Sequence, residues 1–283
     1  MNTVGQWLAH AQARLRDSAQ TQTPELDAQL LACHTLRMTR SRLYAFPETT
    51  LTPTMVDALD ASLKRRLNAE PIAYITGSQE FWSIELHTAP GTLVPRADTE
   101  ILVDKALDLA SDAPEGVILD LGTGTGAIAI AVACELPHRQ IVAIERSDAA
   151  LRVAHNNIRA QTSANLHLVQ GSWLDALADD SIAMVLSNPP YLADNDPHLD
   201  QLRCEPMDAL ISGSTGLEDL EHIIAKTARV GKNNAPLIVE HGNQQAADVR
   251  TLMLDYNYAG VDTGLDLAGH ERISFGYVVK ASL

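Results

Sequence analysis

Residues 117–136 read VILDLGTGTGAIAIAVACEL and contain the most informative pattern of the chain. An apolar run of strand length is followed by the glycine loop GTGTG at 122–126 and then by a run of helical character. Glycine permits a tight turn and a close approach of a ligand to the backbone, and a helix start presents unpaired N–H groups. The segment therefore predicts a strand, a ligand-binding loop and a helix in an α/β domain.

Short apolar runs continue to alternate with helical stretches after this segment. Four of them have strand character: IVAI at 141–144, LHLV at 166–169, MVLS at 184–187 and PLIVE at 236–240. This alternation predicts an α/β, doubly wound fold, in which helices cover both faces of a mostly parallel sheet. The last apolar run, ISFGYVV at 273–279, has no helix after it and is expected to close the sheet edge in antiparallel orientation.

The beginning of the chain has a different, helical texture. Apolar side chains recur there at the spacing of one helix face: Val4, Trp7, Leu8, Ala11 and Leu15. Thr23-Pro24 and Thr52-Pro53 each place a hydroxyl cap before a proline at the first helical position. We expect residues 1–72 to form a small helical bundle, 73–93 to form a β-hairpin connector, and 94–283 to form the α/β domain.

Composition and charge narrow the classes of partner. The 283 residues are 46% hydrophobic and 20% charged, which is typical of a soluble globular protein. Neither a membrane-spanning run nor a secretory signal is evident, so we expect a cytoplasmic protein. A net charge of −15 disfavours stable nucleic-acid binding. The spacing of the cysteines and histidines indicates no disulfide framework and no metal site.

An acidic residue follows the second strand of the predicted sheet. Glu145 stands where a carboxylate can accept both ribose hydroxyls of an adenosine. Trp173 follows the third strand, where an indole could lie against the adenine or serve only as a core residue. The glycine loop also fits the dinucleotide fingerprint, so a nicotinamide-dependent oxidoreductase stays open at this point.

The segment Ser187-Asn188-Pro189-Pro190-Tyr191 ends the fourth strand. Two consecutive prolines cannot continue a sheet ladder, so the strand stops here and the backbone around Asn188 is held rigidly. An asparagine carbonyl and a main-chain carbonyl can each accept one hydrogen from a planar –NH₂ group, and Tyr191 can supply a flat wall. The alternative is a turn that only terminates the strand.

Such an arrangement suits methyl transfer to a planar nitrogen. An amide or aromatic amine has a delocalised lone pair, so it needs positioned acceptors and alignment with a sulfonium methyl rather than a strong base. Hydride transfer does not require this segment, which argues against the oxidoreductase. We expect Asn188, Pro189 and Tyr191 to be catalytic and residues 188–191, including Pro190, to bind the substrate.

With these motifs, the chain resembles the release-factor glutamine methyltransferases over nearly its full length. The resemblance extends to RRLNAEPIAYITGSQEFW, LVPRADTE, RCEP, EHG and DLAGHERISFG. It implies a seven-stranded, Rossmann-like class I methyltransferase that methylates the glutamine in the Gly-Gly-Gln loop of class I peptide chain release factors. It also implies the S-adenosylmethionine contacts Gly122, Thr123, Gly124, Thr125, Gly126, Glu145, Trp173 and Asn188. We interpret the helical region, which carries no chemical motif, as a substrate-recognition domain.

Three positions depart from the family pattern, and some alternatives stay open. Glu145 replaces the usual aspartate, Ser172 replaces a frequent acid, and KNNAP at 232–236 replaces Pro-Gly-Gly. The segment RADTE either borders the methionine end of the cofactor, through Arg96, Thr99 and Glu100, or simply caps a helix with Asp98 or Thr99. The rival functions are an adenine or cytosine amino methyltransferase acting on nucleic acid and a module that binds cofactor without turnover.

Overall fold

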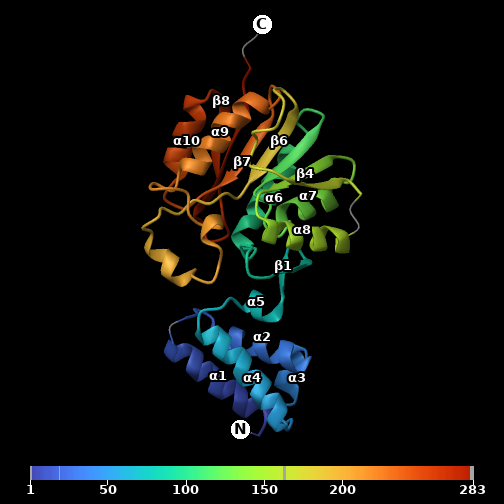
Figure 1. Cartoon of the computed structure of the whole chain (residues 1–283), viewed down its shortest axis with the longest axis vertical. Coiled ribbons are helices and arrows are strands. Elements are labelled where there is room, and N and C mark those ends of the chain that lie inside the picture. Colours follow the sequence, from blue (N-terminus) through green and yellow to red (C-terminus); the bar gives the residue numbers. More distant parts are fainter. Residues whose placement is uncertain (1, 19, 162–163, 281–283) are drawn as a thin grey trace. The chain divides into compact units, whose positions relative to one another are not determined.

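The computed structural model describes residues 2–18, 20–161 and 164–280 (Figure 1). The chain divides into two compact units. The helical unit contains the residues up to Ser78 together with Thr88–Pro90 and His198–Cys204, and the α/β unit contains the rest. Each unit therefore includes segments that are distant in sequence.

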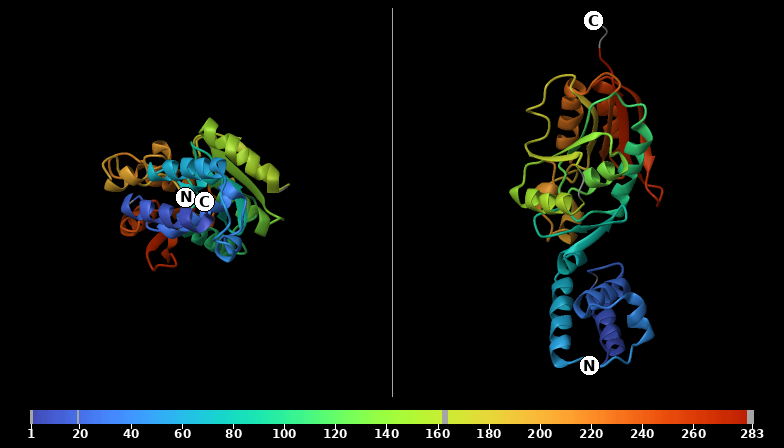
Figure 2. Two further views of the ribbon diagram at one scale, coloured as in Figure 1. Left: turned by 90° about the horizontal axis from the view of Figure 1, so that it is seen from below. Right: turned by 90° about the vertical axis from the view of Figure 1, so that its right-hand side faces the viewer.

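Five helices build the helical unit: α1 (Val4–Ser18), α2 (Pro24–Leu36), α3 (Arg40–Ala45), α4 (Pro53–Leu67) and α5 (Ile72–Thr76). Helix α4 packs against α1 and α2, as the right-hand view of Figure 2 shows. The predicted stripe of α1 is confirmed, because Val4, Trp7, Ala11 and Leu15 are buried and Leu8 packs at the margin of the same core. The indole Nε1 of buried Trp7 donates to Asp60 at 2.8 Å, so burying the ring leaves no donor unpaired.

The two predicted threonine caps have different outcomes. The hydroxyl of Thr52 accepts from the N–H of Met55 at 3.3 Å, as expected for a helix cap. The cap at Thr23 is wrong, although α2 does begin at Pro24. Its backbone is not extended, and its hydroxyl donates instead to the Asp27 carboxylate at 3.2 Å.

The α/β unit is built on a seven-stranded sheet of order β5-β4-β3-β6-β7-β9-β8. Neighbouring strands from β5 through β7 are parallel, and β9 is antiparallel to both β7 and β8. The strands are β3 (Val117–Leu121), β4 (Gln140–Glu145), β5 (Leu166–Gln170), β6 (Ile182–Ser187), β7 (Pro236–Glu240), β8 (Tyr258–Leu265) and β9 (Glu271–Val278). The doubly wound, mostly parallel sheet predicted from the sequence is confirmed.

The position of the last strand corrects one prediction. β9 is antiparallel as expected, but it lies inside the sheet because β8 forms the edge. The sequence of β8, YAGVDTGL, contains two glycines and an aspartate, and most of its residues are at least partly exposed. An edge strand with one solvated face lacks a continuous apolar run, so the pattern did not reveal it.

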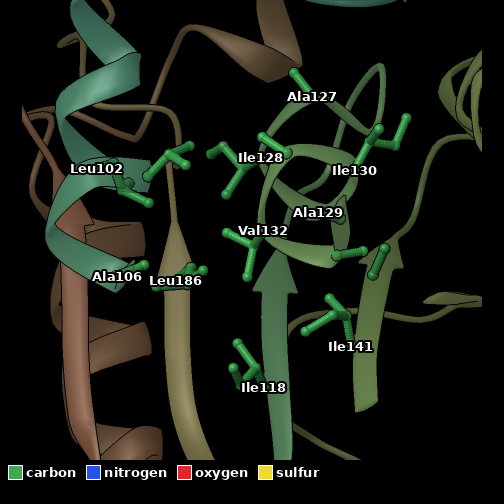
Figure 3. Packing of buried hydrophobic residues seen from close by; sticks show 14 of the residues in the cluster. Leu102, Ala106, Ile118, Ala127, Ile128, Ala129, Ile130, Val132, Ile141 and Leu186 are labelled. Carbon is green, nitrogen blue, oxygen red and sulfur yellow. The ribbon is translucent and has the colours of Figure 1, made fainter. Parts of the chain in front are cut away.

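Helices cover both faces of the sheet and bury alternate residues of each strand. On one face, α6 (Glu100–Leu109) and α7 (Ala127–Glu135) pack on Ile118 and Leu186, as Figure 3 shows. On the other face, α9 (Glu218–Val230) and α10 (Ala246–Asp255) pack on Leu119 and Val185. The remaining elements are α8 (Asp148–Gln161) and the short 3-10 helices η1 (Ala97–Thr99), η2 (Pro197–Gln201) and η3 (Met207–Ala209).

A two-stranded hairpin, β1 (Ser78–Phe81) and β2 (Ile84–His87), precedes the large sheet. Its turn residues Trp82 and Ser83 have φ values of 53° and 58°, the left-handed conformation that two-residue hairpin turns require. The predicted connector began at residue 73, but Ile72–Thr76 forms α5, so the strand pairing starts later. Among the described helices, none combines the length and apolar character needed to cross a membrane.

Candidate active site

The carboxyl ends of the parallel strands gather the predicted site residues at one edge of the sheet. The glycine loop follows β3, Glu145 ends β4, Trp173 follows β5 and Asn188 follows β6. Ligands of open α/β sheets bind at this edge, because the loops there diverge above the strand ends.

The glycine loop turns sharply between β3 and α7. Gly122, Gly124 and Gly126 have φ values of 69°, 57° and 86°, a region that costs other residues about 1–2 kcal/mol. The N–H groups of Gly122 and Thr123 donate to the carbonyl of Ile144, at 2.9 and 3.1 Å. The loop is thereby tied to β4, the strand that carries Glu145.

Asp120 fixes the other side of this loop. Its fully buried carboxylate accepts hydrogen bonds from the Thr123 hydroxyl and, at 3.1 Å, from the N–H of Ala129. Burial raises the pKa of Asp120 to about 7, although both hydrogen bonds oppose the shift. The carboxyl joins the loop to the first turn of α7, a role that the sequence analysis did not assign to it.

Glu145 is buried, and its carboxylate accepts hydrogen bonds from three backbone N–H groups. Oε2 accepts from Gly124 at 3.0 Å, and Oε1 accepts from Arg146 at 2.8 Å and from Ser147 at 2.9 Å. An ionised carboxylate offers about four lone-pair directions, so part of its capacity is still open to a ligand.

A hollow that encloses about 680 Å³ of space, part of it open to solvent, lies beside these residues. Predicted site residues that line it are Gly122, Gly124, Glu145, Trp173, Asn188 and Pro190. A neighbouring hollow of about 390 Å³ is lined by Thr123 and Thr125, and it shares Gly122, Gly124 and Asn188 with the first. Gly126, Pro189 and Tyr191 line neither; Gly126 precedes the first residue of α7.

The indole of Trp173 lies at the wall of the cavity, against the glycine loop. A methyl group added to Gly122 would lie 3.4 Å from its ring, and the ring also packs on the core between the sheet and α9. The side chain therefore serves the core and at the same time presents a surface to the cavity.

Asn188 lies where the two hollows meet. Its Nδ2 donates to the hydroxyl of Thr99 at 3.2 Å, whereas its buried Oδ1 has no hydrogen-bond partner among the described residues. Buried side-chain oxygens are rarely left unpaired, so an unpaired acceptor at a cavity indicates a ligand donor. β6 ends at Ser187, immediately before Asn188 and the two prolines, as predicted.

Tyr191 packs behind Asn188 rather than in the cavity wall. Its hydroxyl donates to Oε1 of Glu240 at 3.3 Å, and its carbonyl accepts from the Gln245 side chain at 3.0 Å. Burial raises the pKa of the Tyr191 phenol well above its usual value, so the hydroxyl stays neutral and acts as a donor.

The RADTE segment, residues 96–100, lies beside the smaller hollow, and its side chains contact other parts of the chain. Arg96 forms an ion pair with buried Glu205, which also accepts from the N–H of Val94 at 2.9 Å. Thr99 precedes α6 without a side-chain capping hydrogen bond, so the structure does not show the alternative in which Thr99 caps the helix, and its hydroxyl accepts from Asn188 instead. Glu100 lies in the first turn as expected and accepts from the N–H of Trp82 at 2.9 Å.

Glu240 is the site residue that the sequence analysis missed. It ends β7 and is 2% exposed, with Tyr191 as its donor. A signal was present, because it is an acidic residue directly after a buried strand, at the same sheet edge as Glu145. The motif EHG at 240–242 is part of the family resemblance, but no other pattern in the sequence marks it as part of the site.

Solved methyltransferase structures share the fold of this chain. A methyltransferase from Pyrococcus furiosus matches 78% of this chain and 100% of its own, with a TM-score of 0.52 at 16% identity. The hMettl16 catalytic domain, in complex with MAT2A 3'UTR hairpin 6, matches 71% of this chain and 77% of its own, with a TM-score of 0.56 at 14% identity. Residues 97–203 match the model of the methyltransferase small domain. The fold and the site define a class I, S-adenosylmethionine-dependent methyltransferase.

Sequence relatives identify the family within that class. The release factor glutamine methyltransferase of Vibrio cholerae is 42% identical over 97% of this chain and 96% of its own length. The Escherichia coli and Haemophilus influenzae proteins of the same name are 42% and 37% identical, over 95% and 97% of this chain and 97% and 99% of their own lengths. Residues 6–77 match the model of the PrmC N-terminal domain. This chain belongs to the release factor glutamine methyltransferase family.

Proposed function

We propose that this protein transfers a methyl group from S-adenosylmethionine to the side-chain amide nitrogen of the glutamine in the Gly-Gly-Gln motif of class I peptide chain release factors. The observation that carries the proposal is the unpaired, buried Oδ1 of Asn188 in the wall of the hollow that Glu145, Trp173 and the glycine loop also line. An acceptor in that place complements the N–H of a carboxamide.

The residues around the cavity fit S-adenosylmethionine. Glu145 supplies the carboxylate for the ribose, Trp173 supplies a flat apolar surface for the adenine, and the glycine loop supplies close backbone approach. Asn188 and the residues of the smaller hollow, Thr123 and Thr125, border the place for the methionine end. When bound, the cofactor supplies a methyl group on a positively charged sulfur.

The protein's own contribution is positioning and electrostatics. The Asn188 carbonyl oxygen accepts one hydrogen of the target amide, and the backbone carbonyl beside it accepts the second, which holds the nitrogen lone pair toward the sulfonium methyl. Positive charge that develops on the nitrogen is stabilised by these fixed dipoles. The new N–C bond would form as the S–C bond of the sulfonium breaks, which leaves S-adenosylhomocysteine, and the nitrogen becomes neutral again by losing one of its protons to solvent. Pro189 and Pro190 hold the acceptors rigid, and Tyr191 supports them from behind.

We assign recognition of the release factor to the helical unit. A single glutamine side chain offers little binding energy, so the remainder must come from contacts remote from the reacting group. Two of the three basic residues at the end of α4 are paired, exposed Arg65 with Glu70 and largely buried Arg66 with Asp27. Because release factors act in translation, the proposed location is the cytoplasm.

A direct assay tests the function. The protein is incubated with methyl-labelled S-adenosylmethionine and a release factor, and the modified residue is mapped by mass spectrometry. We expect one methyl group on the glutamine of Gly-Gly-Gln and none on a release factor whose motif reads Gly-Gly-Ala. Methylation of nucleic acid without methylation of the release factor would favour the amino methyltransferase instead.

A further inference from the structure

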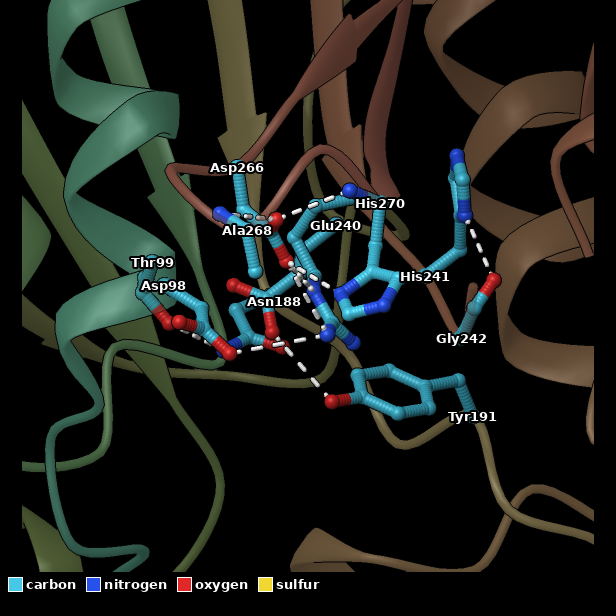
Figure 4. Close-up of polar contacts among 11 residues, drawn as sticks. Asp98, Thr99, Asn188, Tyr191, Glu240, His241, Gly242, Asp266, Ala268 and His270 are labelled. Atoms are coloured by element: carbon cyan, nitrogen blue, oxygen red, sulfur yellow. Dashed lines mark hydrogen bonds and ion pairs between the residues drawn. The ribbon is translucent and has the colours of Figure 1, made fainter. Parts of the chain in front are cut away.

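Glu240 is a buried acid that lies behind the proposed glutamine pocket without facing the cavity. Its Oε1 accepts the Tyr191 hydroxyl at 3.3 Å, and Oε2 completes no hydrogen bond among the described residues. The Thr99 hydroxyl lowers the pKa of Glu240, which opposes the larger raising effect of burial. Figure 4 shows Glu240 between Thr99 and Asn188 on one side and Tyr191 on the other.

Thr99 connects this acid to Asn188. Because Thr99 is 4% exposed and accepts a hydrogen from Asn188 Nδ2, its own proton needs an acceptor. The carboxylate of Glu240 is an acceptor only, so it can take that proton but cannot donate to Thr99. Oε2 of Glu240 has no hydrogen-bond partner among the described residues, so it is open to the Thr99 proton.

We propose that Glu240 is a positioning residue for methyl transfer, which acts through Thr99 to set the amide of Asn188 with its carbonyl oxygen toward the substrate nitrogen. The proposal rests on the proposed function and adds to it the group that decides which way the asparagine amide points. With a carboxylate at the far end, every hydrogen bond runs in one direction: Asn188 donates to Thr99, and Thr99 donates to Glu240. The Asn188 oxygen is then the only side left for the substrate.

A hydrogen-bond donor in place of the acceptor at position 240 would reverse the direction of the hydrogen bonds that join Asn188, Thr99 and residue 240. A glutamine or a protonated carboxyl at 240 can donate to Thr99, whose hydroxyl is then free to donate to Asn188. The Asn188 amide would turn over, because its oxygen is the better partner for that hydroxyl. It would then present –NH₂ to the substrate –NH₂, and two facing donors cannot form a hydrogen bond.

The charged and titratable groups around Glu240 set the pH at which this happens. Burial raises the pKa of Glu240 to about 7, and Asp98 of η1 adds to the shift, whereas Thr99, Tyr191 and Arg272 oppose it. Arg272 of β9 is shared with Asp98 at 3.5 Å and Asp266 at 3.3 Å, so its charge is partly neutralised. The adjacent His241 is buried, with a lowered pKa, and its Nδ1 donates to the Gly242 carbonyl at 2.9 Å, so it stays neutral. The carboxylate form therefore dominates only above about pH 7.

The first experiment compares turnover of the parent protein with Glu240→Gln and Thr99→Val on a release factor. Each replacement conserves the shape of the side chain and interrupts the hydrogen bonds that run from Asn188 through Thr99 to Glu240. We expect each to lower kcat by about tenfold to hundredfold, the scale for a residue that orients a reacting side chain. In Glu240→Gln, S-adenosylmethionine affinity should change by less than about threefold, because Glu240 lines neither hollow and the three backbone bonds of Glu145 are untouched.

The double variant Glu240→Gln/Thr99→Val separates positioning from general damage. If the two residues act through one series, the double variant should be no slower than the slower single variant. Multiplied losses would overturn the proposal, as would a Thr99→Val variant with the parent kcat. Glu271→Gln is the matched control, since Glu271 lies on neighbouring β9 and pairs with Arg250 at 3.0 Å, outside the series. It should keep the parent kcat.

A pH profile gives a readout that a purely structural role would not move. The parent kcat should fall about tenfold per pH unit below about pH 7, as the Glu240 carboxylate takes up its proton. In Glu240→Gln this acid limb should be absent. Melting curves confirm that the variants are folded. A parent that does not methylate release factors refutes the proposed function, whereas an active parent whose acid limb persists in Glu240→Gln refutes only the role of Glu240.

Discussion

The Glu145 carboxylate accepts a hydrogen bond from the backbone N–H of Gly124, with 3.0 Å between Oε2 and the nitrogen. This bond joins the acid at the end of β4 to the middle of the glycine loop. One side chain thus both shapes the loop and offers an acceptor to the cavity. Loop geometry and ribose binding are therefore coupled through Glu145.

Replacing this acid should weaken cofactor binding far more than turnover. Glu145→Gln exchanges one acceptor oxygen for an –NH₂ group that faces backbone donors, and a lost charged hydrogen bond costs about 1.5–3 kcal/mol. We expect the Kd for S-adenosylmethionine in calorimetry to rise by about tenfold to hundredfold, with kcat at saturating cofactor within about threefold of the parent. Exposed Glu115→Gln is the control. An unchanged Kd in Glu145→Gln would show that the carboxylate does not serve the cofactor.

Asn188 is expected to matter most for turnover. Asn188→Ala removes the acceptor for the target amide, and losing one preorganised acceptor typically costs about 100- to 1000-fold in kcat. Cofactor affinity should fall less. Asn188→Asp keeps the shape and acceptors but adds a charge near the sulfonium, so we expect poor methylation of the glutamine amide and some activity on an amine substrate. A parent rate in Asn188→Ala would rule out the mechanism.

Two glycines allow a matched test of the backbone behind Tyr191. Gly216 and Gly269 have similar positive φ values, 79° and 83°, so alanine strains both by about 1–2 kcal/mol. Only at Gly216 would the new methyl group collide, at 2.5 Å from the Tyr191 carbonyl oxygen. We expect Gly216→Ala to lower kcat by about tenfold or more by displacing Tyr191. Gly269→Ala should lower only Tm, and equal kcat losses in both would contradict this.

The stability of the protein should fall between about pH 4 and pH 7, in part because of Asp120. Its pKa rises from 3.8 to about 7 on folding, so in this window the folded state binds more protons than the unfolded state. Stability from this group is therefore present below the unfolded pKa and is lost as the pH rises. Asp120→Asn cannot ionise, so its stability relative to the parent should increase with pH in urea titrations. A difference that is constant from pH 5 to about pH 8 would mean that Asp120 is already ionised at low pH.

The recognition role of the helical unit predicts a dependence on substrate size. A chain that lacks residues 1–77 should methylate a short Gly-Gly-Gln peptide at about the parent rate, because the proposed site residues lie in the α/β unit. It should have lost the parent's preference for the intact release factor over the peptide. Activity on the peptide controls for folding. If the truncated chain retains the preference, the recognition surface lies in the α/β unit.

Features of the protein that depend on local sequence pattern could be predicted without the structure. β3, the glycine loop and α7 were predicted correctly because an apolar run, a glycine series and a helical run follow one another directly. The end of β6 at Ser187 was predicted because two prolines cannot donate to a sheet ladder. Glu145 could be placed at the cavity edge because parallel strands all end on one side.

Contacts between residues that are distant in sequence became visible in the folded chain alone. Thr99 and Asn188 are hydrogen-bonded although 89 positions separate them, and Tyr191 reaches Glu240 across 49 positions. β9 pairs with β7 on one side and with β8 on the other, so β8 forms the edge of the sheet. The composition of β8 does not encode this position. Local periodicity specifies strands and helices, whereas the orientation of the Asn188 amide depends on hydrogen bonds between elements that only folding brings together.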